Sequence, residues 1–314
     1  MKKILIADDL HENIFPLLAN LGFQVNYQPD IKRAEILEII KDYEGLLIRS
    51  KTKIDREFLS FCTKLEFIGR AGAGLDLIDL EAVEEKSIKV FAANEGNSDA
   101  VAEHTMGMIL MLFNKLNFAD AEVHQGIWHR EENRGIELCG MTVGIIGYGN
   151  MGKALSQRLI GFGVNTLAFD TDAKKISNEE FFAKKATMAN IFEEADIISI
   201  HVPLTDHTHM MVNEDFIRQF KKNFFLINTS RGEVASTKAI LKGLLSGKVR
   251  GACLDVLENE KLTQLTPEQS EVYSQLFKQK NVILSPHIAG WTMESYRKIN
   301  EVLVSKLREL GLSN

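Results

Sequence analysis

The residues best suited to chemistry are an arginine, a glutamate and a histidine that each follow an apolar run in the second half of the chain: Arg231, Glu260 and His287. A guanidinium can grip a carboxylate and polarise a neighbouring carbonyl, and a histidine can exchange a proton near neutral pH. A carboxylate beside that histidine can fix its tautomer and raise its pKa. Next to a nicotinamide ring, these groups suffice for hydride transfer at a carbon that bears a hydroxyl and a carboxylate. The segment LENEK also offers Glu258, which stays the alternative to Glu260 as the partner of the histidine.

A glycine-rich turn in the stretch VGIIGYGNMG offers a place for that ring, because three spaced glycines follow an apolar strand and precede a helical run. The first glycine allows a tight turn, the second lets backbone N–H groups approach a pyrophosphate, and the third allows close packing of helix on strand. The next strand ends at Asp170, whose carboxylate can bind an adenosine ribose and would repel a 2′-phosphate. No Arg or Lys follows at 171–173, so the sequence predicts NAD rather than NADP. The predicted contacts of the turn are Gly147, Tyr148, Gly149, Asn150, Met151 and Gly152.

Short apolar runs that alternate with helix-length segments must position these residues. Such runs, rich in Ile, Val, Leu and Phe, are typical of buried parallel strands in βαβ units, whose ligands bind beyond the carboxyl ends of the strands. About ten runs are too many for one ordinary sheet, so the sequence predicts an α/β fold with two doubly wound parallel sheets. The runs are KILIA, GLLIR, FIGRAG, KVFAA, TVGIIG, NTLAFD, DIISIHV, FFLINTS, GACLDV and NVILSP.

The length of 314 residues favours two domains. We expect the cofactor domain to span residues 96–285 and the first 95 residues to form another domain. Residues 98–126 predict a long buried helix at the start of the cofactor domain, because their apolar side chains suit helical packing. The final helix, from Thr292 on, could pack on either domain.

Composition narrows the class of protein. The formal net charge of -6 and the absence of a basic run argue against a nucleic-acid partner and against binding to an anionic membrane. The longest uncharged apolar run, residues 106–113, is far shorter than a bilayer requires. Three cysteines, odd in number and without a CxxC pair, indicate reduced thiols and a cytoplasmic location. They are Cys62, Cys139 and Cys253.

One cluster of histidines and one adjacent Glu-His pair are expected to be neither a metal site nor a catalytic pair. His201, His207 and His209 lie in a loop without Cys or Glu at ligand spacing, so the sequence predicts no metal site. Glu103 and His104 are adjacent in a predicted helix, and adjacent helical residues do not face each other. A packing role is therefore expected for His104.

Five motifs in the second half of the chain resemble, in order and spacing, those of the D-isomer-specific 2-hydroxyacid dehydrogenase family: GIIGYGNMG with Asp170, HVPLTDHT, INTSRGE, LDVLENE and SPHIAG. The segments LLIRSKTKID, FIGRAGAGLDLIDLEA and GNSDAVAEHTMGMIL are most similar to the D-3-phosphoglycerate dehydrogenase branch of that family. The resemblance covers nearly the whole chain. It implies a flavodoxin-like substrate-binding domain, residues 1–95 plus 286–314, and a Rossmann NAD-binding domain, residues 96–285.

The resemblance also implies roles for individual residues. Arg231 would bind the substrate carboxylate, His287 would be the acid/base, and Glu260 would be its partner. Further implied cofactor contacts, with Thr229 and Asp255 near the nicotinamide, are His201, Val202, Pro203, Thr208, Thr229, Ser230, Asp255 and Gly290. Implied substrate contacts, including backbone N–H groups of the RAGAG loop, are Arg49, Ser50, Arg70, Ala73, Gly74 and Asn97.

The implied activity is NAD-dependent interconversion of a D-2-hydroxy acid and its 2-keto acid, first of all 3-phosphoglycerate and 3-phosphohydroxypyruvate in serine biosynthesis. Arg49, Arg70 and Arg130 are candidates for binding the phosphate, although solvated strand-end charges explain them equally well. Hydroxypyruvate, glyoxylate or D-lactate chemistry is the alternative, and a non-catalytic NAD(H)-sensing protein is a further one. Members of the family commonly form homodimers through the cofactor domain, and the apolar helix near 101–113 suits such a contact.

The sequence departs from the family pattern at two positions. Lys261 follows Glu260 where many relatives have a proline, and it begins a polar stretch. Gly96 stands where the linker motif Asn-x-Pro has its proline. Neither change removes a reactive group. The length leaves no room for a further regulatory domain, so feedback control by serine through such a domain is not expected.

Overall fold

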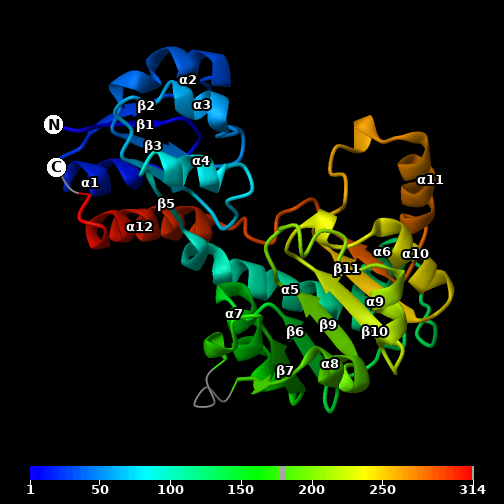
Figure 1. Cartoon of the computed structure of the whole chain (residues 1–314). Coiled ribbons are helices and arrows are strands. Elements are labelled where there is room, and N and C mark those ends of the chain that lie inside the picture. Colours follow the sequence, from blue (N-terminus) through cyan, green and yellow to red (C-terminus); the bar gives the residue numbers. More distant parts are fainter. Residues whose placement is uncertain (177–181, 313–314) are drawn as a thin grey trace. The chain divides into compact units, whose positions relative to one another are not determined.

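The computed structural model describes residues 1–176 and 182–312 and divides the chain into two compact units (Figure 1). The first unit contains Met1–Ser98 and Trp291–Asn314, and the second contains Asp99–Gly290. The sequence predicts the corresponding boundaries at 95/96 and 285/286. Each unit has its own sheet and its own hydrophobic core.

The sheet of the first unit has five parallel strands in the order β2-β1-β3-β4-β5. This is the strand order of flavodoxin-like folds, in which helices cover both faces of the sheet. All residues of the central strand β3 are buried, as coverage on both faces requires. The strands are β1 (Lys3–Ile6), β2 (Gln24–Tyr27), β3 (Gly45–Ile48), β4 (Phe67–Arg70) and β5 (Lys89–Ala92).

Helices cover the two faces of this sheet with separate sets of apolar side chains. On one face, Ile36, Phe58 and Val83 come from three successive helices of the N-terminal segment. On the other face, Leu18 packs in one core with Leu303 from the C-terminal helix. The helices are α1 (Ile14–Ala19), α2 (Arg33–Ile39), α3 (Arg56–Ser60), α4 (Leu80–Glu85) and α12 (Met293–Glu309), with the 3₁₀ helices η1 (Ile40–Asp42) and η2 (Asn94–Asn97).

Gly96 allows η2 to approach the backbone of α12 closely. A methyl group at Gly96 would lie 2.7 Å from the N and Cα atoms of Ile299. Lys306 of α12 strengthens the same contact, because its Nζ donates to the Ala92 carbonyl at 2.7 Å and pairs with Glu95 at 2.8 Å. The glycine at the position of the family's linker proline therefore has a packing reason.

Replacing Gly96 with alanine should lower the free energy of unfolding by about 1–3 kcal/mol, because backbone atoms of α12 cannot move aside as a flexible side chain can. Urea denaturation of the intact chain, followed by circular dichroism, measures this change. Gly161→Ala is the matched control, since nothing lies within 4 Å of the added methyl group. It should change the free energy by less than about 0.5 kcal/mol. Equal effects of the two substitutions would contradict the packing argument.

The sheet of the second unit has seven parallel strands in the order β12-β11-β10-β9-β6-β7-β8. Counted from β6, this is the Rossmann order 3-2-1-4-5-6 with one more strand beside the sixth. The two doubly wound parallel sheets confirm the predicted fold class. The strands are β6 (Thr142–Ile146), β7 (Asn165–Phe169), β8 (Lys184–Lys185), β9 (Ile197–Ile200), β10 (Phe224–Asn228), β11 (Val249–Leu254) and β12 (Val282–Leu284).

Helices also cover both faces of the second sheet, with α5 and α7 on one side and α8, α9 and α10 on the other. None of the helices in the described parts of the chain is long and apolar enough to cross a membrane. The helices are α5 (Ser98–Phe113), α6 (Leu116–His124), α7 (Asn150–Leu159), α8 (Met188–Glu194), α9 (Glu214–Gln219), α10 (Thr237–Leu245) and α11 (Pro267–Leu276), with η3 (Ile160–Phe162), η4 (Ala173–Lys175), η5 (Gly232–Val234) and η6 (Leu262–Gln264).

The apolar runs of the sequence identify ten strands, and the structure adds β2 and β8. Both lie at an edge of their sheet. None of the residues of β2 is buried, and both residues of β8 are exposed lysines. An edge strand pairs on one side only and can remain polar, so it leaves no apolar run to find.

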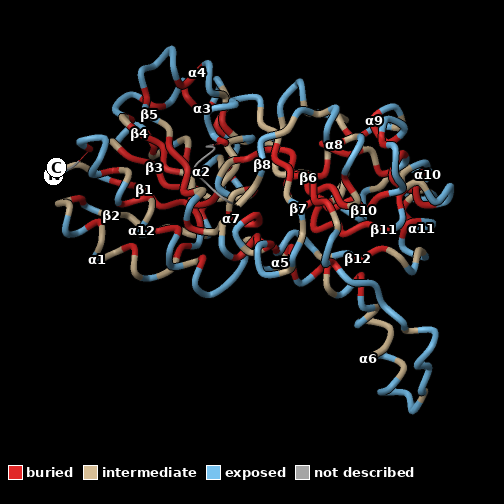
Figure 2. The backbone as a smooth tube through the Cα atoms, turned by 90° about the horizontal axis from the view of Figure 1, so that it is seen from below, coloured by how far each residue is buried: buried red, intermediate tan, exposed pale blue. Residues whose placement is uncertain are grey.

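The predicted long helix over 98–126 is two helices with different environments. α5 ends at Phe113, Lys115 adopts a φ of 52°, and α6 begins at Leu116. Most apolar residues of α5 are buried in the core of their own unit, which leaves few of them for the contact surface expected at 101–113. No residue of α6 is buried, and Figure 2 shows this helix extending from the body of its unit.

Candidate active site

Three neighbouring parallel strands bring the predicted chemical residues to one edge of the second sheet. Arg231 follows β10, Glu260 follows β11 and His287 follows β12. Carboxyl ends of parallel strands lie together, and ligands of open α/β sheets bind beyond them. The sheet thus gathers residues that are far apart in the sequence.

His287 is paired with Glu260 and has an uncommon backbone conformation. Its Nδ1 lies 3.0 Å from Glu260 Oε2, and its φ is 55°. The hydrogen bond with Glu260 raises the pKa of His287, although burial opposes the rise; the charge of Asp255 adds to it and that of Arg231 opposes it. Because Nδ1 is engaged, Nε2 is the ring nitrogen left to exchange a proton with a ligand.

Asp255 fixes the loop on both sides of His287. Its carboxylate accepts hydrogen bonds from the Ser285 hydroxyl at 2.6 Å and from the backbone N–H groups of Ile288 and Ala289 at 2.9 and 2.8 Å. Its backbone carbonyl accepts from the His287 N–H at 2.8 Å. A left-handed histidine persists only where surrounding contacts determine it, and these four bonds do so. The position of Asp255 thus makes it a support of the histidine loop.

His104 of α5 continues this network. Its Nε2 lies 2.9 Å from Ser285 Oγ and 3.6 Å from Asp255 Oδ1. The same ring nitrogen faces both groups, so they do not form the relay of a serine nucleophile, in which the histidine bridges the other two. Sequence reasoning missed Ser285 and expected only packing for His104. The sequence does contain a signal for this role: Ser285 directly follows an apolar run and lies two positions before His287.

The backbone around Arg231 is organised by Asn228, the buried last residue of β10. Asn228 Oδ1 accepts hydrogen bonds from the N–H and hydroxyl of Ser230 at 3.0 and 2.9 Å. Its amide donates to the Arg231 carbonyl at 3.0 Å, and the Arg231 guanidinium donates to the Ser230 carbonyl at 2.7 Å. Asn228 is a second supporting residue that the sequence pattern did not single out.

Gly232 sets the distance between the arginine segment and the loop that carries Glu260. A methyl group at Gly232 would lie 1.8 Å from the carbonyl oxygen of Leu257. Within that loop, Glu258 accepts a hydrogen bond from the Thr237 N–H at 3.0 Å, at the first turn of α10. Glu258 is therefore engaged at a helix N-terminus, and Glu260 is the carboxylate that reaches His287.

The glycine turn after β6 has the shape that a dinucleotide requires. Gly147 has a φ of 93°, and a methyl group there would lie 2.5 Å from the His201 carbonyl oxygen. A methyl group at Gly152 would lie 2.2 Å from the Gly147 carbonyl oxygen, which explains the close approach of α7 to the strand. Nothing lies within 4 Å of a methyl group at Gly149, the N-cap of α7. The open space at this helix N-terminus fits a pyrophosphate.

Asp170 lies at the end of β7 with its carboxylate held in place. Its oxygens accept from the Tyr148 N–H at 2.8 Å and the Asp172 N–H at 2.9 Å. Lys175 Nζ also lies 3.2 Å from Asp170 Oδ1. A carboxylate has about four lone-pair sites, so capacity remains for a ribose hydroxyl. Sequence reasoning looked for a cation at 171–173 only and missed this lysine, which offsets part of the charge on Asp170.

A model of the D-isomer specific 2-hydroxyacid dehydrogenase NAD-binding domain matches residues 106–289 of the chain. The chain belongs to the D-isomer-specific 2-hydroxyacid dehydrogenase family. This confirms the resemblance drawn from the motifs, and it confirms NAD as the cofactor.

Individual relatives in this dehydrogenase family match almost the whole chain. D-3-phosphoglycerate dehydrogenase of Methanocaldococcus jannaschii is 35% identical over 99% of the chain and 57% of its own length. Hydroxypyruvate reductase of Thermotoga maritima is 32% identical over 99% of each sequence. The structure of a D-lactate dehydrogenase of Aquifex aeolicus with NAD and lactic acid aligns with a TM-score of 0.81, 28% identity, and coverage of 98% of this chain and 96% of the other. The chain thus spans little more than half the length of the phosphoglycerate dehydrogenase.

The pairing of Glu260 with His287 predicts an effect of pH on keto-acid reduction, the reaction expected of this family. Reduction of a keto acid needs a protonated histidine, so activity should be present at low pH and lost as the pH rises through the pKa of His287. Glu260 raises that pKa. Glu260→Gln should therefore move the high-pH limb of kcat/KM for keto-acid reduction to lower pH. The control Glu258→Gln removes the carboxylate at α10 and should leave the limb in place; identical profiles for wild type and Glu260→Gln would contradict the pairing.

The other cofactor contacts predicted in the second unit lie in the loops after β9, β10 and β12. His201 Nε2 lies at a hydrogen-bond distance of 2.8 Å from Ser199 Oγ. Burial lowers the pKa of His201 to about 4, so its ring is neutral at pH 7. Thr208 Oγ1 donates to the Pro203 carbonyl at 2.6 Å and closes the loop. Thr229 Oγ1 lies 3.3 Å from Thr105 Oγ1 of α5. Val202 is partly buried beside this loop, and Gly290 ends the unit.

In the first unit, the predicted substrate contacts lie at or after the carboxyl ends of β3, β4 and β5, and a buried aspartate follows β1. Asp8, buried after β1, accepts a hydrogen bond from the Arg49 N–H at 2.6 Å. Burial raises the pKa of Asp8, and the charges of Lys51, Arg49 and Arg70 oppose that rise. The charges of three cations thus act on one buried carboxyl group, and the exposed Ser50 lies between two of them in sequence.

The loop after β4 is shaped by the side chain of Arg70. Gly72 has a φ of 141°, and a methyl group there would lie 1.5 Å from Arg70 Nη1. The partly buried Ala73 and Gly74 follow in the same loop. Asn97 is partly buried, with an Oδ1 that has no hydrogen-bond partner within the described residues. Arg130 belongs to the second unit, on the exposed segment after α6.

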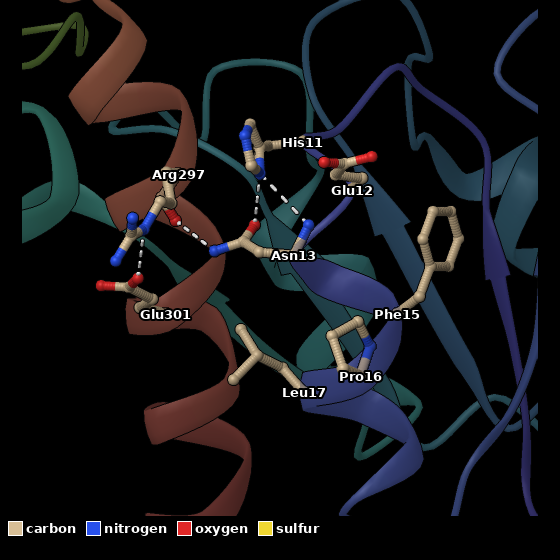
Figure 3. Close-up of a pocket in the computed structure, with 8 residues that line it drawn as sticks. All are labelled: His11, Glu12, Asn13, Phe15, Pro16, Leu17, Arg297 and Glu301. Carbon is tan, nitrogen blue, oxygen red and sulfur yellow. Dashed lines mark hydrogen bonds and ion pairs between the residues drawn. The ribbon is translucent and has the colours of Figure 1, made fainter.

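A surface hollow between α1 and α12 is a less suitable site (Figure 3). Its polar groups are engaged with one another: His11 Nδ1 lies 3.0 Å from Asn13 Oδ1, and the Asn13 amide donates to the Arg297 carbonyl at 3.2 Å. The Arg297 guanidinium pairs with Glu301 at 3.0 Å. A binding site needs polar groups that converge on a ligand, and these groups converge on each other.

Proposed function

We propose that this chain is an NAD-dependent dehydrogenase that interconverts a D-2-hydroxy acid and its 2-keto acid. The observation that carries the proposal is the 3.0 Å contact between His287 and Glu260 at the sheet edge that also bears Arg231. The same unit contains the glycine turn and Asp170. A proton-exchanging group, a cation for a carboxylate and a dinucleotide site are what this chemistry needs.

In the direction of oxidation, His287 takes the proton of the C2 hydroxyl at Nε2, and Glu260 stabilises the imidazolium that forms. Arg231 binds the substrate carboxylate and stabilises negative charge on the developing carbonyl oxygen. NAD, when bound, supplies the acceptor for the hydride that leaves C2. Asp255 keeps His287 in its left-handed conformation, and Asp170 binds the adenosine ribose.

The proposed substrate pair is 3-phosphoglycerate and 3-phosphohydroxypyruvate, the chemistry that opens serine biosynthesis. Arg49 and Arg70, with Lys51 beside them, support this choice, because guanidinium groups bind phosphate through charge-assisted hydrogen bonds. Several of the most similar relatives are D-3-phosphoglycerate dehydrogenases. The alternative is reduction of hydroxypyruvate, which the Thermotoga relative favours because it matches along 99% of both sequences.

Parallel assays of NADH oxidation with 3-phosphohydroxypyruvate, hydroxypyruvate, glyoxylate and pyruvate test both levels of the proposal. We expect kcat/KM for the phosphorylated acid to exceed that for hydroxypyruvate by about 10- to 100-fold, the effect of one or two hydrogen bonds to a charged group. The reverse preference would favour the hydroxypyruvate alternative. Tight NADH binding without turnover of any of these acids would favour an NAD(H)-sensing protein.

We further propose that the protein forms a homodimer through the second unit, with α6 and the segment after it as the contact. Leu116 and Val123 of α6 are 52% and 53% exposed, and Trp128 after it is 80% exposed. Exposed apolar patches of this kind mark interaction surfaces. Sedimentation equilibrium should give the mass of two chains for the wild type and of one chain for the double variant Leu116→Lys, Val123→Lys. An unchanged mass would contradict this contact.

The proposed compartment is reducing and cytoplasm-like. The structure has Cys62 and Cys253 as buried free thiols and Cys139 as an exposed free thiol. Burial raises the pKa of Cys62 to about 11 and that of Cys253 above its usual range, so neither is a reactive thiolate at pH 7. An exposed free cysteine fits a compartment that keeps thiols reduced.

A further inference from the structure

The guanidinium of Arg49 lies on an aromatic face instead of a carboxylate. Its Cζ atom is 3.6 Å from the centroid of the Trp291 ring and 5.7 Å from that of Tyr296. Over residues 1–176 and 182–312, no acidic side chain forms an ion pair with Arg49, and its guanidinium makes no hydrogen bond. A guanidinium that stacks through its face keeps its N–H donors free in the ring plane. The arginine is thus oriented but its donors are unused.

The indole of Trp291 is itself held in place, although it is 50% exposed. Its ring centroid lies 5.4 Å from that of Tyr296, with an interplanar angle of 50°. The Tyr296 hydroxyl donates to Asp9 Oδ2, and the Tyr27 hydroxyl donates to Asp9 Oδ1 at 3.0 Å. Tyr296 is therefore anchored at its far end, and it supports Trp291 from the side.

The charge of Arg49 is only partly balanced by its surroundings. Burial lowers the pKa of Arg49, and the nearby Tyr296, Asp8 and Asp9 oppose this shift without cancelling it. The charges of Lys51 and Arg70 lower the pKa of the buried Asp8 against the effect of burial. The Asp8 carboxylate accepts a hydrogen bond from the backbone N–H of Arg49 and not from its guanidinium. The unused donors of Arg49 are then available to an anionic group from outside the chain.

We propose that Trp291 is a positioning residue for Arg49: its contact with the guanidinium holds the arginine so that the N–H donors bind an anionic group of the substrate, the phosphate of a phosphorylated acid. This inference rests on the proposed function and deepens it, because it makes Trp291 a contributor to the preference for a phosphorylated acid. A cation–π contact contributes about 0.5–2 kcal/mol, which corresponds to about a 2- to 30-fold change in binding.

Steady-state kinetics with two substrates separate positioning from general damage. For Trp291→Leu, KM for 3-phosphohydroxypyruvate should rise about 3- to 30-fold with kcat within about twofold of wild type, and KM for hydroxypyruvate should not change. Trp291→Phe keeps an aromatic face and should recover most of the loss. In an Arg49→Gln background, Trp291→Leu should add nothing, because the contact is already absent. Equal losses for the two substrates, or full additivity with Arg49→Gln, would overturn the proposal.

Fluorescence gives a test that needs no turnover. The chain has two tryptophans, so Trp128→Phe leaves Trp291 as the single tryptophan. Titration of this variant with 3-phosphoglycerate should change its emission to saturation, while glycerate should not, and Arg49→Gln should abolish the response. The absence of any response to 3-phosphoglycerate would overturn the inference even if the wild type reduces keto acids. A saturable response from a protein that reduces none of them would instead leave the anion site in place and refute the proposed dehydrogenase activity.

Discussion

Replacing His287 with alanine should lower kcat for a 2-keto acid by about 10²- to 10⁴-fold, the range attributed to a single general acid or base. The substitution removes the imidazole ring, including the Nε2 atom that is left to exchange a proton. The 3.0 Å hydrogen bond between Nδ1 and Glu260 is lost as well. The glycine turn and Asp170 lie at other strands, β6 and β7. The affinity for NADH should therefore stay within about threefold of wild type, which is less than 1 kcal/mol.

Stopped-flow measurement of a single turnover, together with an NADH titration, tests this expectation. Single-turnover conditions isolate the chemical step from product release. Lys238→Ala, at an exposed lysine of α10, is the control and should leave both quantities unchanged. Parallel losses of kcat and of NADH affinity in His287→Ala would argue that His287 supports the fold of the unit and does not exchange the proton.

Replacing Gly232 with alanine should lower kcat/KM by at least about 100-fold, since misplacement of catalytic groups by about 1 Å has an effect of this order. The new methyl group would lie 1.8 Å from the Leu257 carbonyl oxygen, and backbone on both sides must move to accept it. One side is the segment of Arg231, and the other is the loop that leads to Glu260. The relative position of the two charged groups is therefore lost.

The same substitution should reduce the free energy of unfolding by about 1–3 kcal/mol, as overpacking does elsewhere. Activity should fall much further than this destabilisation explains, because the protein remains folded under assay conditions. Gly161→Ala, which adds a methyl group in open space, is the control for activity as well. A Gly232→Ala protein with wild-type kcat/KM would show that the two segments can separate without consequence.

The sequence was sufficient to predict the central parts of the fold and the placement of three candidate residues at one sheet edge, and the reason is geometric. Buried parallel strands are continuous apolar runs, and whatever follows them lies at one edge of the sheet. Arg231, Glu260 and His287 follow three such runs. The supporting residues could not be found in this way. Asp255 acts through four hydrogen bonds whose partners are brought together only by the fold. Lys175 lies five positions after Asp170 and contacts its carboxylate.

The helix prediction over 98–126 failed for a similar reason. Apolar residues continue through the segment, with Leu116 and Val123 after the break, so the pattern gives no sign that burial stops. Only the left-handed φ of Lys115 and the exposure of α6 reveal it. Apolar periodicity reports which face is apolar, and it does not report what covers that face.

The place of α12 in the first unit has a consequence for synthesis of the protein. A ribosome releases residues 1–98 long before α12, yet one face of their sheet is covered by Ile299, Leu303 and Leu307 of that helix. The second unit is continuous in the chain and can fold as soon as it has emerged. The first unit cannot complete the cover of this face until residues 291–312 follow, so its folding joins two segments that are separated by the whole second unit and is expected to be slow. During that interval the exposed face is where a chaperone would bind the nascent chain.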